Sequence, residues 1–286
     1  MLMAKNVKNL PESIKNPDIP APRACIKYQS GPSPPMETLT ASSQDQRRMY
    51  GDLAWLWPII STPKNYVSEA EFFVKLITKH SVIPVKTVLH LGCGAGHIDW
   101  TLKKHFSITG VDLSGAMLAL ARRLNPDVRY RQGDMRTVRL RRMFDAVVIA
   151  DSITYMLSEA DLKKAFATAW THLRPGGIFC TYAEQTRESF EQNKTKNSRH
   201  ARGDVEVTFI ENAFDPDPRD TTCVFTFVFL IGRAGKVRVE TDHHLAGLFG
   251  IETWLRLLRK AGFEVTQVRY PGETIPTFVC AKPRKP

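Results

Sequence analysis

The sequence has no closely spaced pair of cysteines and no long apolar run. Its five cysteines are scattered along 286 residues without a C-x-x-C pair, which argues against a structural zinc site and fits a reducing compartment. No apolar segment is long enough to predict a membrane-spanning helix, and residues 1–25 lack the apolar core of a signal peptide. We therefore expect a cytoplasmic protein with no bound metal and no membrane partner.

The composition predicts a folded body preceded by an arm of different character. With 286 residues and 43% hydrophobic content, the chain can bury one large core, alone or with a small addition. Residues 1–46 contain seven prolines and little periodicity, which is typical of an extended or flexible arm. The formal net charge of +11 makes acidic partners worth considering.

The run Val88 to His97, VLHLGCGAGH, is the part around which we expect the fold to be organised. Its first half is a short apolar run, typical of a buried parallel strand, and its second half has glycine at alternate positions before a helical pattern. Gly92, Gly94 and Gly96 carry no Cβ, so the backbone can approach a ligand at the carboxyl end of the strand. Taken alone, this pattern also fits an ordinary turn between a strand and a helix.

Four further markers follow in order. The apolar run that begins at Ile108 ends at Asp112, where a carboxylate can accept both ribose hydroxyls of a nucleoside. A third short strand closes on a G-D-M turn at 133–135, residues 144–150 predict a fourth strand, and a P-G-G turn at 175–177 leads into a fifth. Five markers in this order are far more specific than the glycine pattern alone.

On these motifs the sequence, from about residue 50 onward, resembles the class I S-adenosylmethionine-dependent methyltransferases. Within that family it is similar to bacterial small-molecule enzymes of the aminosugar N,N-dimethyltransferase type. The resemblance implies S-adenosylmethionine as cofactor and S-adenosylhomocysteine as product. It also implies a small-molecule acceptor that is methylated on nitrogen or oxygen, by a monomer or a homodimer.

The alternation of elements predicts an α/β fold: a Rossmann-like, doubly wound methyltransferase sheet of seven strands with a terminal antiparallel pair and an antiparallel β insertion. The expected strands of the core are at 87–91, 108–111, 128–132, 144–150, 178–182, 263–269 and 276–281. The expected helices are at 68–80, from 98 to 105, at 114–124, 158–173 and 251–261. A capping box formed by Ser68 and Glu71 is expected to begin the first of these helices.

The predicted organisation has five parts, which are a flexible arm (1–46), a helical lid with the first core helix (47–84), the cofactor-binding core (85–184), an antiparallel insertion over the active site (185–250) and a terminal helix with a strand pair (251–286). In the insertion, period-two alternation predicts strands at 205–210, 222–231 and 236–244, with a hairpin turn at 232–235.

The resemblance places a set of residues around the cofactor. Asp112 would bind the ribose, Asp134 and the backbone of Met135 would meet the adenine edge, and Ala150 would pass close to the sulfonium. The remaining cofactor candidates are Tyr66, His90, Gly92, Cys93, Gly94, Gly96, Leu113 and Met117. Tyr66, Leu113 and Met135 also fit a role as ordinary packed residues.

His90 departs from the family pattern, which commonly has an acidic residue two positions before the first glycine. In many relatives that carboxylate orients the ammonium group of the cofactor. Histidine here fits either a neutral core residue bonded to a neighbouring group or an altered contact with the cofactor.

The acceptor side is predicted from two segments. Asp151, Ser152 and Tyr155 follow the fourth strand, where the family builds its acceptor pocket. His244 matches a histidine of the aminosugar enzymes, and it could take a proton from the acceptor; His243 and Tyr50 are further catalytic candidates. Alternatively, Tyr50 is a packed aromatic, and the paired histidines are solvated, bonded to a neighbouring aspartate or part of a metal site that lacks a recognisable third ligand.

Two other functions fit parts of the sequence. Residues 122–142 contain eight arginines, which an RNA methyltransferase could use to neutralise phosphates, although solvated surface explains them equally well. The cationic stretch 194–202 invites the same two interpretations. A non-catalytic cofactor-binding protein would explain His90 and the uncertain base.

Overall fold

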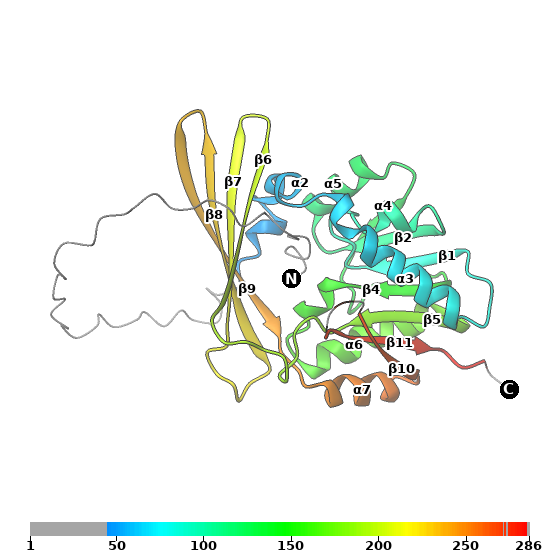
Figure 1. Ribbon diagram of the computed structural model, residues 1–286. Helices are drawn as coiled ribbons and strands as arrows, with labels where there is room; N and C mark the ends of the chain where they lie inside the picture. Colours follow the sequence, from blue (N-terminus) through cyan, green and yellow to red (C-terminus); the bar gives the residue numbers. More distant parts are fainter. Residues whose placement is uncertain (1–44, 271, 273, 285–286) are drawn as a thin grey trace.

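Two β-sheets organise the protein (Figure 1), and the computed structural model describes residues 45–270, 272 and 274–284. The predicted arm therefore lies outside the described residues, except for its last two positions. Among the described helices, none combines the length and the apolar character needed to cross a bilayer.

The larger sheet has seven strands in the order β10-β11-β5-β4-β1-β2-β3. The strands are β1 (Thr87–Leu91), β2 (Ser107–Asp112), β3 (Arg129–Gln132), β4 (Phe144–Ile149), β5 (Leu173–Tyr182), β10 (Glu264–Arg269) and β11 (Pro276–Ala281). All neighbours are parallel except β11, which is antiparallel to both β5 and β10. The predicted Rossmann-like fold with a terminal antiparallel pair is confirmed.

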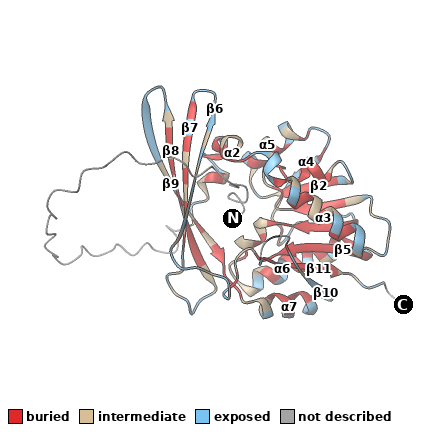
Figure 2. Cartoon of the chain, in the orientation of Figure 1, coloured by how far each residue is buried: buried red, intermediate tan, exposed pale blue. Residues whose placement is uncertain are grey.

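Helices cover both faces of this sheet. The helices are α3 (Val67–His80), α4 (Asp99–Leu102), α5 (Gly115–Leu124), α6 (Glu159–His172) and α7 (Ile251–Lys260). Buried residues of α3, α4 and α5 form one apolar cluster, and those of α6 and α7 form another on the opposite face. All six residues of β4 are buried, because its side chains alternate between these two clusters. Figure 2 shows that β5 is also buried over most of its length.

Two helix starts differ from the sequence prediction. The prediction of a capping box formed by Ser68 and Glu71 is wrong. A helical turn, η4 (Pro63–Tyr66), leads straight into α3, and Tyr66 occupies the N-cap without a side-chain bond. The helix after the glycine loop is shorter than expected and ends at Leu102. In contrast, the helix expected at 114–124 begins where predicted, and Ser114 caps α5 through a bond from the Met117 N–H to its hydroxyl.

The second sheet is antiparallel and has the order β6-β7-β8-β9. Its strands are β6 (Lys194–Arg202), β7 (Val205–Phe214), β8 (Thr222–Arg233) and β9 (Lys236–Gly247). Three were predicted, with shorter bounds. The fourth, β6, was not predicted; it is an edge strand bonded to β7 along its whole length, and none of its residues is buried, which agrees with the interpretation of 194–202 as solvated surface.

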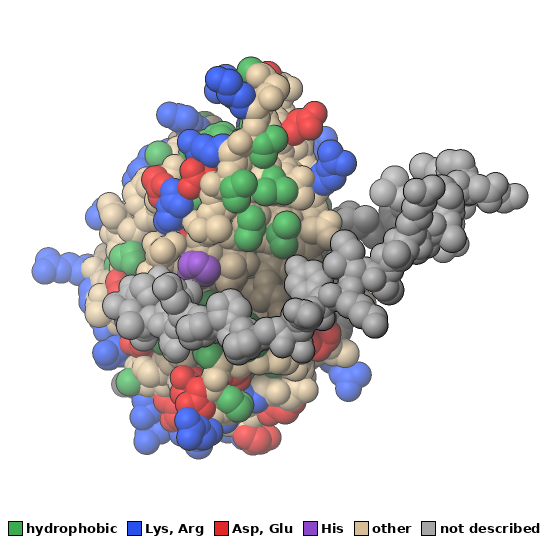
Figure 3. Space-filling model, turned by 90° about the vertical axis from the view of Figure 1, so that its left-hand side faces the viewer, with side chains coloured by type: hydrophobic (Ala, Val, Ile, Leu, Met, Phe, Trp, Pro, Cys, Tyr) green, Lys and Arg blue, Asp and Glu red, His purple; other side chains and the backbone are tan. Residues whose placement is uncertain are grey.

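The two faces of the second sheet differ. Phe209, Phe225, Phe227 and Phe229 are buried on the inner face, where they pack with residues of the segment that links the two sheets. On the outer face, Val237 and Val239 are 72% and 58% exposed. Figure 3 views the molecule from this side and shows hydrophobic side chains gathered on it.

Residues 45–66 connect the two sheets (Figure 1). They form short helical turns, η2 (Arg48–Tyr50), η3 (Ala54–Leu56), α2 (Trp57–Ile60) and η4, rather than one aromatic-rich helix. The backbone N–H groups of Arg48 and Met49 donate to the Asp242 carboxylate on β9, at 2.9 and 2.6 Å. The Ser114 hydroxyl, at the start of α5, donates to the Tyr50 carbonyl. The segment is therefore bonded to both sheets.

A buried carboxylate holds the start of the larger sheet together. Asp145 is 5% exposed and accepts from the N–H groups of Lys86 and Thr87 at 3.0 and 2.9 Å, as well as from the Thr87 hydroxyl and the Arg174 guanidinium. We predict that Asp145→Ala lowers the free energy of unfolding by about 2 to 4 kcal/mol, because it leaves buried donors without an acceptor. Urea unfolding measures this loss.

The matched control is Asp127→Ala, which removes an exposed carboxylate paired with Lys103. An exposed ion pair of this kind contributes little to stability, because solvent screens it. Equal losses for the two variants would contradict the role given to Asp145.

Candidate functional site

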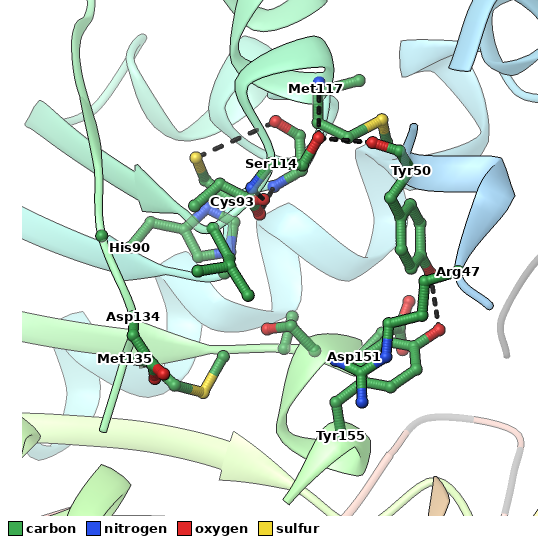
Figure 4. Close-up of a pocket in the computed structure, with 18 of the residues that line it drawn as sticks. Arg47, Tyr50, His90, Cys93, Ser114, Met117, Asp134, Met135, Asp151 and Tyr155 are labelled. Atoms are coloured by element: carbon green, nitrogen blue, oxygen red, sulfur yellow. Dashed lines mark hydrogen bonds between the residues drawn. The ribbon is translucent and has the colours of Figure 1, made fainter. Parts of the chain in front are cut away.

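A cavity of about 430 Å³ lies at the carboxyl ends of the parallel strands. Its wall includes Gly92 after β1, Asp112 at the end of β2, Gly133 after β3 and Ala150 after β4. In open α/β sheets this edge is where ligands bind. Figure 4 shows Tyr50, Tyr155 and Arg47 on one side of the cavity, His90 and Cys93 on another, and Asp134 and Met135 at a third.

The glycine loop leaves room for a ligand. Gly94 has φ of +52°, and a Cβ built on it would have only the Met117 Cε within 4 Å, at 3.9 Å. Its N–H donates to Asp112 Oδ2 at 2.7 Å, while the Ser114 N–H donates to Oδ1 at 2.8 Å. Burial raises the pKa of Asp112, although these N–H groups oppose the shift. Asp112 thus links the loop to β2 and presents its carboxylate to the cavity.

Gly96 does not have the predicted place along the cavity. A Cβ there would come within 2.6 Å of the Tyr130 hydroxyl and 2.7 Å of the Asn125 amide. The residue is glycine because the turn packs tightly against α5 and β3, so its role is to shape the loop.

The wall near Asp112 suits a flat aromatic ligand. Leu113 lines the cavity while remaining 59% exposed, and Met117 and Met135 add buried apolar surface. Asp134 also lines the cavity, but both its carboxylate oxygens accept from Arg136, which lowers its pKa. Arg136 was not predicted, and the contact of Asp134 with adenine stays a prediction.

His90 is bonded to a buried carboxylate that the sequence analysis did not single out. Its Nδ1 lies 2.7 Å from Asp99 Oδ1, and Asp99 Oδ2 accepts from the Tyr130 hydroxyl at 3.0 Å. His90 lines the cavity. The acidic group of this region is therefore present, but it comes from α4 and acts on the cavity through the imidazole.

A second histidine, His97, lines the cavity just after the glycine loop and was also missed. Trp57 Nε1 donates to its Nδ1 at 3.3 Å, and the Ser61 hydroxyl lies 3.4 Å from the same atom. Tyr66, a predicted cofactor residue, packs against the imidazole with ring centres 5.3 Å apart. Burial lowers the pKa of His97 to about 4.

This pKa predicts a loss of stability in mild acid. Between pH 6.5, the ordinary value for histidine, and about pH 4, the unfolded chain binds a proton at His97 that the folded chain excludes. Stability is therefore full above pH 6.5 and falls as the pH is lowered, by about 2 kcal/mol between pH 7 and pH 5. We expect His97→Gln to remove this part of the pH dependence in urea unfolding. Equal pH dependence in the two proteins would contradict the assignment.

Four side chains form a hydrogen-bonded chain on the acceptor side. The Tyr50 and Tyr155 hydroxyls are 2.8 Å apart, the Tyr155 hydroxyl lies 2.7 Å from His244 Nδ1, and His244 Nε2 lies 2.8 Å from Asp242 Oδ2. The two tyrosines line the cavity, whereas His244 and Asp242 are 0% exposed behind them. We call these four residues the relay.

The chemistry of each group determines which atom donates and which accepts in each hydrogen bond of the relay. Asp242 only accepts, and although burial opposes it, the bonds from His244 and the backbone keep its pKa low. His244 Nε2 therefore donates to Asp242, and its Nδ1 accepts from the Tyr155 hydroxyl. Burial raises the pKa of both phenols, so neither serves as a phenolate. A proton that leaves the cavity can reach His244 through Tyr155.

His243 does not belong to this site. Its side chain bonds to the Thr226 hydroxyl at 3.2 Å, on the face of β9 opposite to His244, because neighbouring residues of a strand point to opposite faces. The prediction that His243 is catalytic is corrected. The alternative that the paired histidines bond to a neighbouring aspartate holds for His244, which bonds to Asp242 because residues two apart on a strand share a face.

The residues after β4 line the cavity as predicted. The Asp151 carboxylate accepts from the buried Tyr182 hydroxyl, and the Ser152 hydroxyl donates to the Leu91 carbonyl at 3.3 Å. The Arg47 guanidinium, which was not predicted as a site residue, lies over the Tyr155 ring at 4.7 Å. Within the described part of the chain, no group of three histidine, cysteine or acidic side chains is placed to hold a metal ion.

Comparison with known proteins agrees with this geometry. Residues 88–177 match the family model of a methyltransferase domain. The dTDP-3-amino-3,6-dideoxy-α-D-glucopyranose N,N-dimethyltransferase of Streptomyces fradiae is 26% identical over 79% of this chain and 89% of its own length.

Two solved structures share the fold. CalS10 of Micromonospora echinaspora, an amino pentose methyltransferase with S-adenosylmethionine bound, has a TM-score of 0.69 and 26% identity over 76% of this chain and 91% of its own. DesVI of Streptomyces venezuelae has a TM-score of 0.72 and 27% identity over 84% of this chain and 99% of its own.

A methyltransferase domain model and proteins named as methyltransferases match this chain, which supports S-adenosylmethionine-dependent methyltransferase activity. Its site fits the cofactor, since open space faces Gly94, an exposed apolar Leu113 meets the cavity, and the Asp112 carboxylate lies between them. The comparisons do not support an RNA methyltransferase. The arginines of 122–142 are also dispersed, since Arg136 lines the cavity, Arg139 bonds to α6 and Arg142 packs on Phe144.

Proposed function

We propose that this enzyme methylates the amino group of a small, sugar-like acceptor, and that a nucleotide-linked aminosugar is its substrate. The observation that carries the proposal is the relay, because it joins the cavity to a buried histidine and carboxylate. Support comes from the relatives, of which one is named for a dTDP-linked amino sugar and another for an amino pentose.

The chain has two tasks in this reaction. When bound, S-adenosylmethionine supplies an electrophilic methyl group on a sulfonium, and displacement breaks the S–C bond as the N–C bond forms. The protein must hold the amine in line with that bond and receive the proton that the nitrogen loses. We assign the first task to the cavity wall, including Asp151, whose carboxylate attracts an amine.

The second task falls to the relay. An amine that is protonated as an ammonium group has no free lone pair, so this proton must leave the nitrogen before the transfer. In our proposal the amine donates to the Tyr50 oxygen, the Tyr50 proton moves to Tyr155, and the Tyr155 proton moves to His244 Nδ1. Asp242, held as a carboxylate, then stabilises the imidazolium. Tyr50 is the group that touches the acceptor, and His244 acts through the tyrosines.

The cofactor assignments made from the sequence remain part of the proposal. Asp112 is assigned to the ribose, Leu113 to the adenine face and Ala150 to the neighbourhood of the sulfonium. We also propose a cytoplasmic location, since the four cysteines in the described part of the chain are all free thiols.

The direct test is turnover by the purified full-length chain with S-adenosylmethionine and matched acceptors. One set carries a dTDP-linked sugar with an amino group, the second carries the same sugars with a hydroxyl in its place, and the third is bulk tRNA. Mass spectrometry should detect one or two added methyl groups in the first set alone. Methylation confined to the hydroxyl sugars or to tRNA would overturn the proposal.

A further inference from the structure

Two cavity-lining histidines flank the glycine loop, and in each of them a neighbour fixes one ring nitrogen. His90 precedes the loop and is bonded to Asp99; His97 follows it and is bonded to Trp57. The charge of Asp99 acts on His97 as well, so the two imidazoles share one region of the cavity. The relay uses neither of them.

The partner of His90 makes its other nitrogen an acceptor. Asp99 is fully buried and takes a bond from the Tyr130 hydroxyl on its second oxygen, so it acts as an acceptor toward both neighbours. The His90 proton then lies on Nδ1, and Nε2 carries a lone pair. That Nε2 is buried and has no hydrogen-bond partner among the described residues. A buried acceptor of this kind is costly unless a donor meets it.

The partner of His97 gives the opposite result. An indole N–H can only donate, so the Trp57 bond requires a lone pair on His97 Nδ1 and leaves the proton on Nε2. Burial keeps this imidazole neutral, with a pKa of about 4. His97 thus offers the cavity a donor, where His90 offers an acceptor.

We propose that the two histidines bind the two charged groups of the amino-acid part of the cofactor. His90 Nε2 accepts from the α-ammonium group, and His97 Nε2–H donates to the α-carboxylate. The inference rests on the proposed function, because it assumes that the cavity binds S-adenosylmethionine and S-adenosylhomocysteine. It assigns recognition of a zwitterion to two imidazoles of opposite hydrogen-bonding polarity.

Calorimetry with four ligands tests the assignment without turnover. The ligands are S-adenosylhomocysteine, its decarboxylated analogue, its deaminated analogue and 5′-methylthioadenosine, which lacks both groups. His90→Asn keeps a donor for Asp99 and loses the acceptor at Nε2, while His97→Asn keeps an acceptor for Trp57 and loses the donor. Glutamine at either position restores a polar atom near the place of Nε2.

Each variant should be sensitive to one group of the ligand. We expect His90→Asn to weaken S-adenosylhomocysteine and its decarboxylated analogue by about 10-fold or more and to leave the deaminated analogue unchanged. His97→Asn should weaken S-adenosylhomocysteine and the deaminated analogue to the same extent and leave the decarboxylated one unchanged. The glutamine variants should recover part of the loss, and 5′-methylthioadenosine should bind all forms alike.

Three results would overturn the inference. Unchanged affinity for S-adenosylhomocysteine in both asparagine variants, or an equal loss for all four ligands, would show that the histidines only support the loop, and the methyltransferase assignment would stand. A crossed pattern, with His90 sensitive to the carboxylate, would reverse the roles. A native chain that binds none of the four ligands would remove both this inference and the cofactor site.

Discussion

Asp112→Ala is expected to weaken the binding of S-adenosylhomocysteine by about 100-fold or more. In the structure the carboxylate lines the cavity at the end of β2 and accepts from the N–H groups of Gly94 and Ser114. A hydrogen bond to a charged group contributes about 1.5 to 3 kcal/mol, so losing two ribose contacts and the loop anchor removes about 3 kcal/mol or more. Titration calorimetry measures the effect directly.

A ligand-based control separates the ribose contact from a disordered loop. The native chain and Asp112→Ala are each titrated with S-adenosylhomocysteine and with its 2′,3′-dideoxy analogue. If Asp112 binds the ribose hydroxyls, their removal costs affinity in the native chain and little in the variant, so the two changes are not additive. Additive losses would mean that Asp112 acts only by shaping the loop.

The second large effect is expected at the relay. Tyr155→Phe removes the hydroxyl that links Tyr50 to His244 and leaves the ring under the Arg47 guanidinium. We predict a fall in kcat of about 100-fold or more, which is typical for loss of general base catalysis. The affinity for S-adenosylhomocysteine should stay within about 3-fold of the native value, because the relay lies on the acceptor side. A 3-fold change in affinity corresponds to less than about 1 kcal/mol. Single-turnover assays with an amino sugar measure the first quantity, and calorimetry the second.

Neighbouring histidines provide the matched pair of variants. His244→Gln breaks the relay behind Tyr155, whereas His243→Gln changes a side chain that faces the other side of β9 and bonds to Thr226. Only the first should lower kcat, and raising the pH should recover part of its activity because the acceptor amine then loses its proton to solvent. Equal kcat values for the two variants, or a normal kcat for Tyr155→Phe, would exclude the relay from the reaction.

The core of the fold was predictable because its residues carry a strong signal. β4 is apolar except for Asp145 and is buried on both faces, and β1 and β2 have the same character apart from His90, Thr109 and the end residues. Each of these strands is followed by a turn with glycine or aspartate. Such segments have few alternatives to a central parallel strand.

Where side chains do not decide the structure, the prediction failed. The sequence of β6, KTKNSRHAR, has no apolar alternation, and its strand conformation comes from backbone bonds to β7. The capping box at Ser68 failed for a related reason, since the preceding turn at Pro63–Tyr66 already supplies the start of α3. In both places the neighbouring chain, rather than the local pattern, sets the conformation.

The candidate site likewise has residues that the sequence could predict and residues that it could not. Gly94 and Asp151 follow, and Asp112 ends, parallel strands that the sequence predicts, so their meeting at one edge follows from the topology. The bond between Tyr155 and His244 joins residues 89 positions apart, one in the helical turn that follows β4 and the other on β9, and no pattern within either segment predicts it. His97 and Asp99 were missed because their roles depend on bonds that the local sequence pattern does not show. Trp57 bonds to one ring nitrogen of His97, and Asp99 bonds to one ring nitrogen of His90.

The bonds from the backbone of residues 48 and 49 to Asp242 span more than 190 positions of sequence. They join two segments that lie outside the part of the chain matched by the family model. The residues around the cofactor lie mostly within the stretch from His90 to Ser152, which the family model largely covers. The relay, by contrast, is assembled mainly by residues 48–50 and 242–244, outside that stretch. Substitutions that change the relay through residues 48–50 or 242–244 therefore leave the stretch from His90 to Ser152 untouched, and a change in one outer segment also alters the bonds of the other.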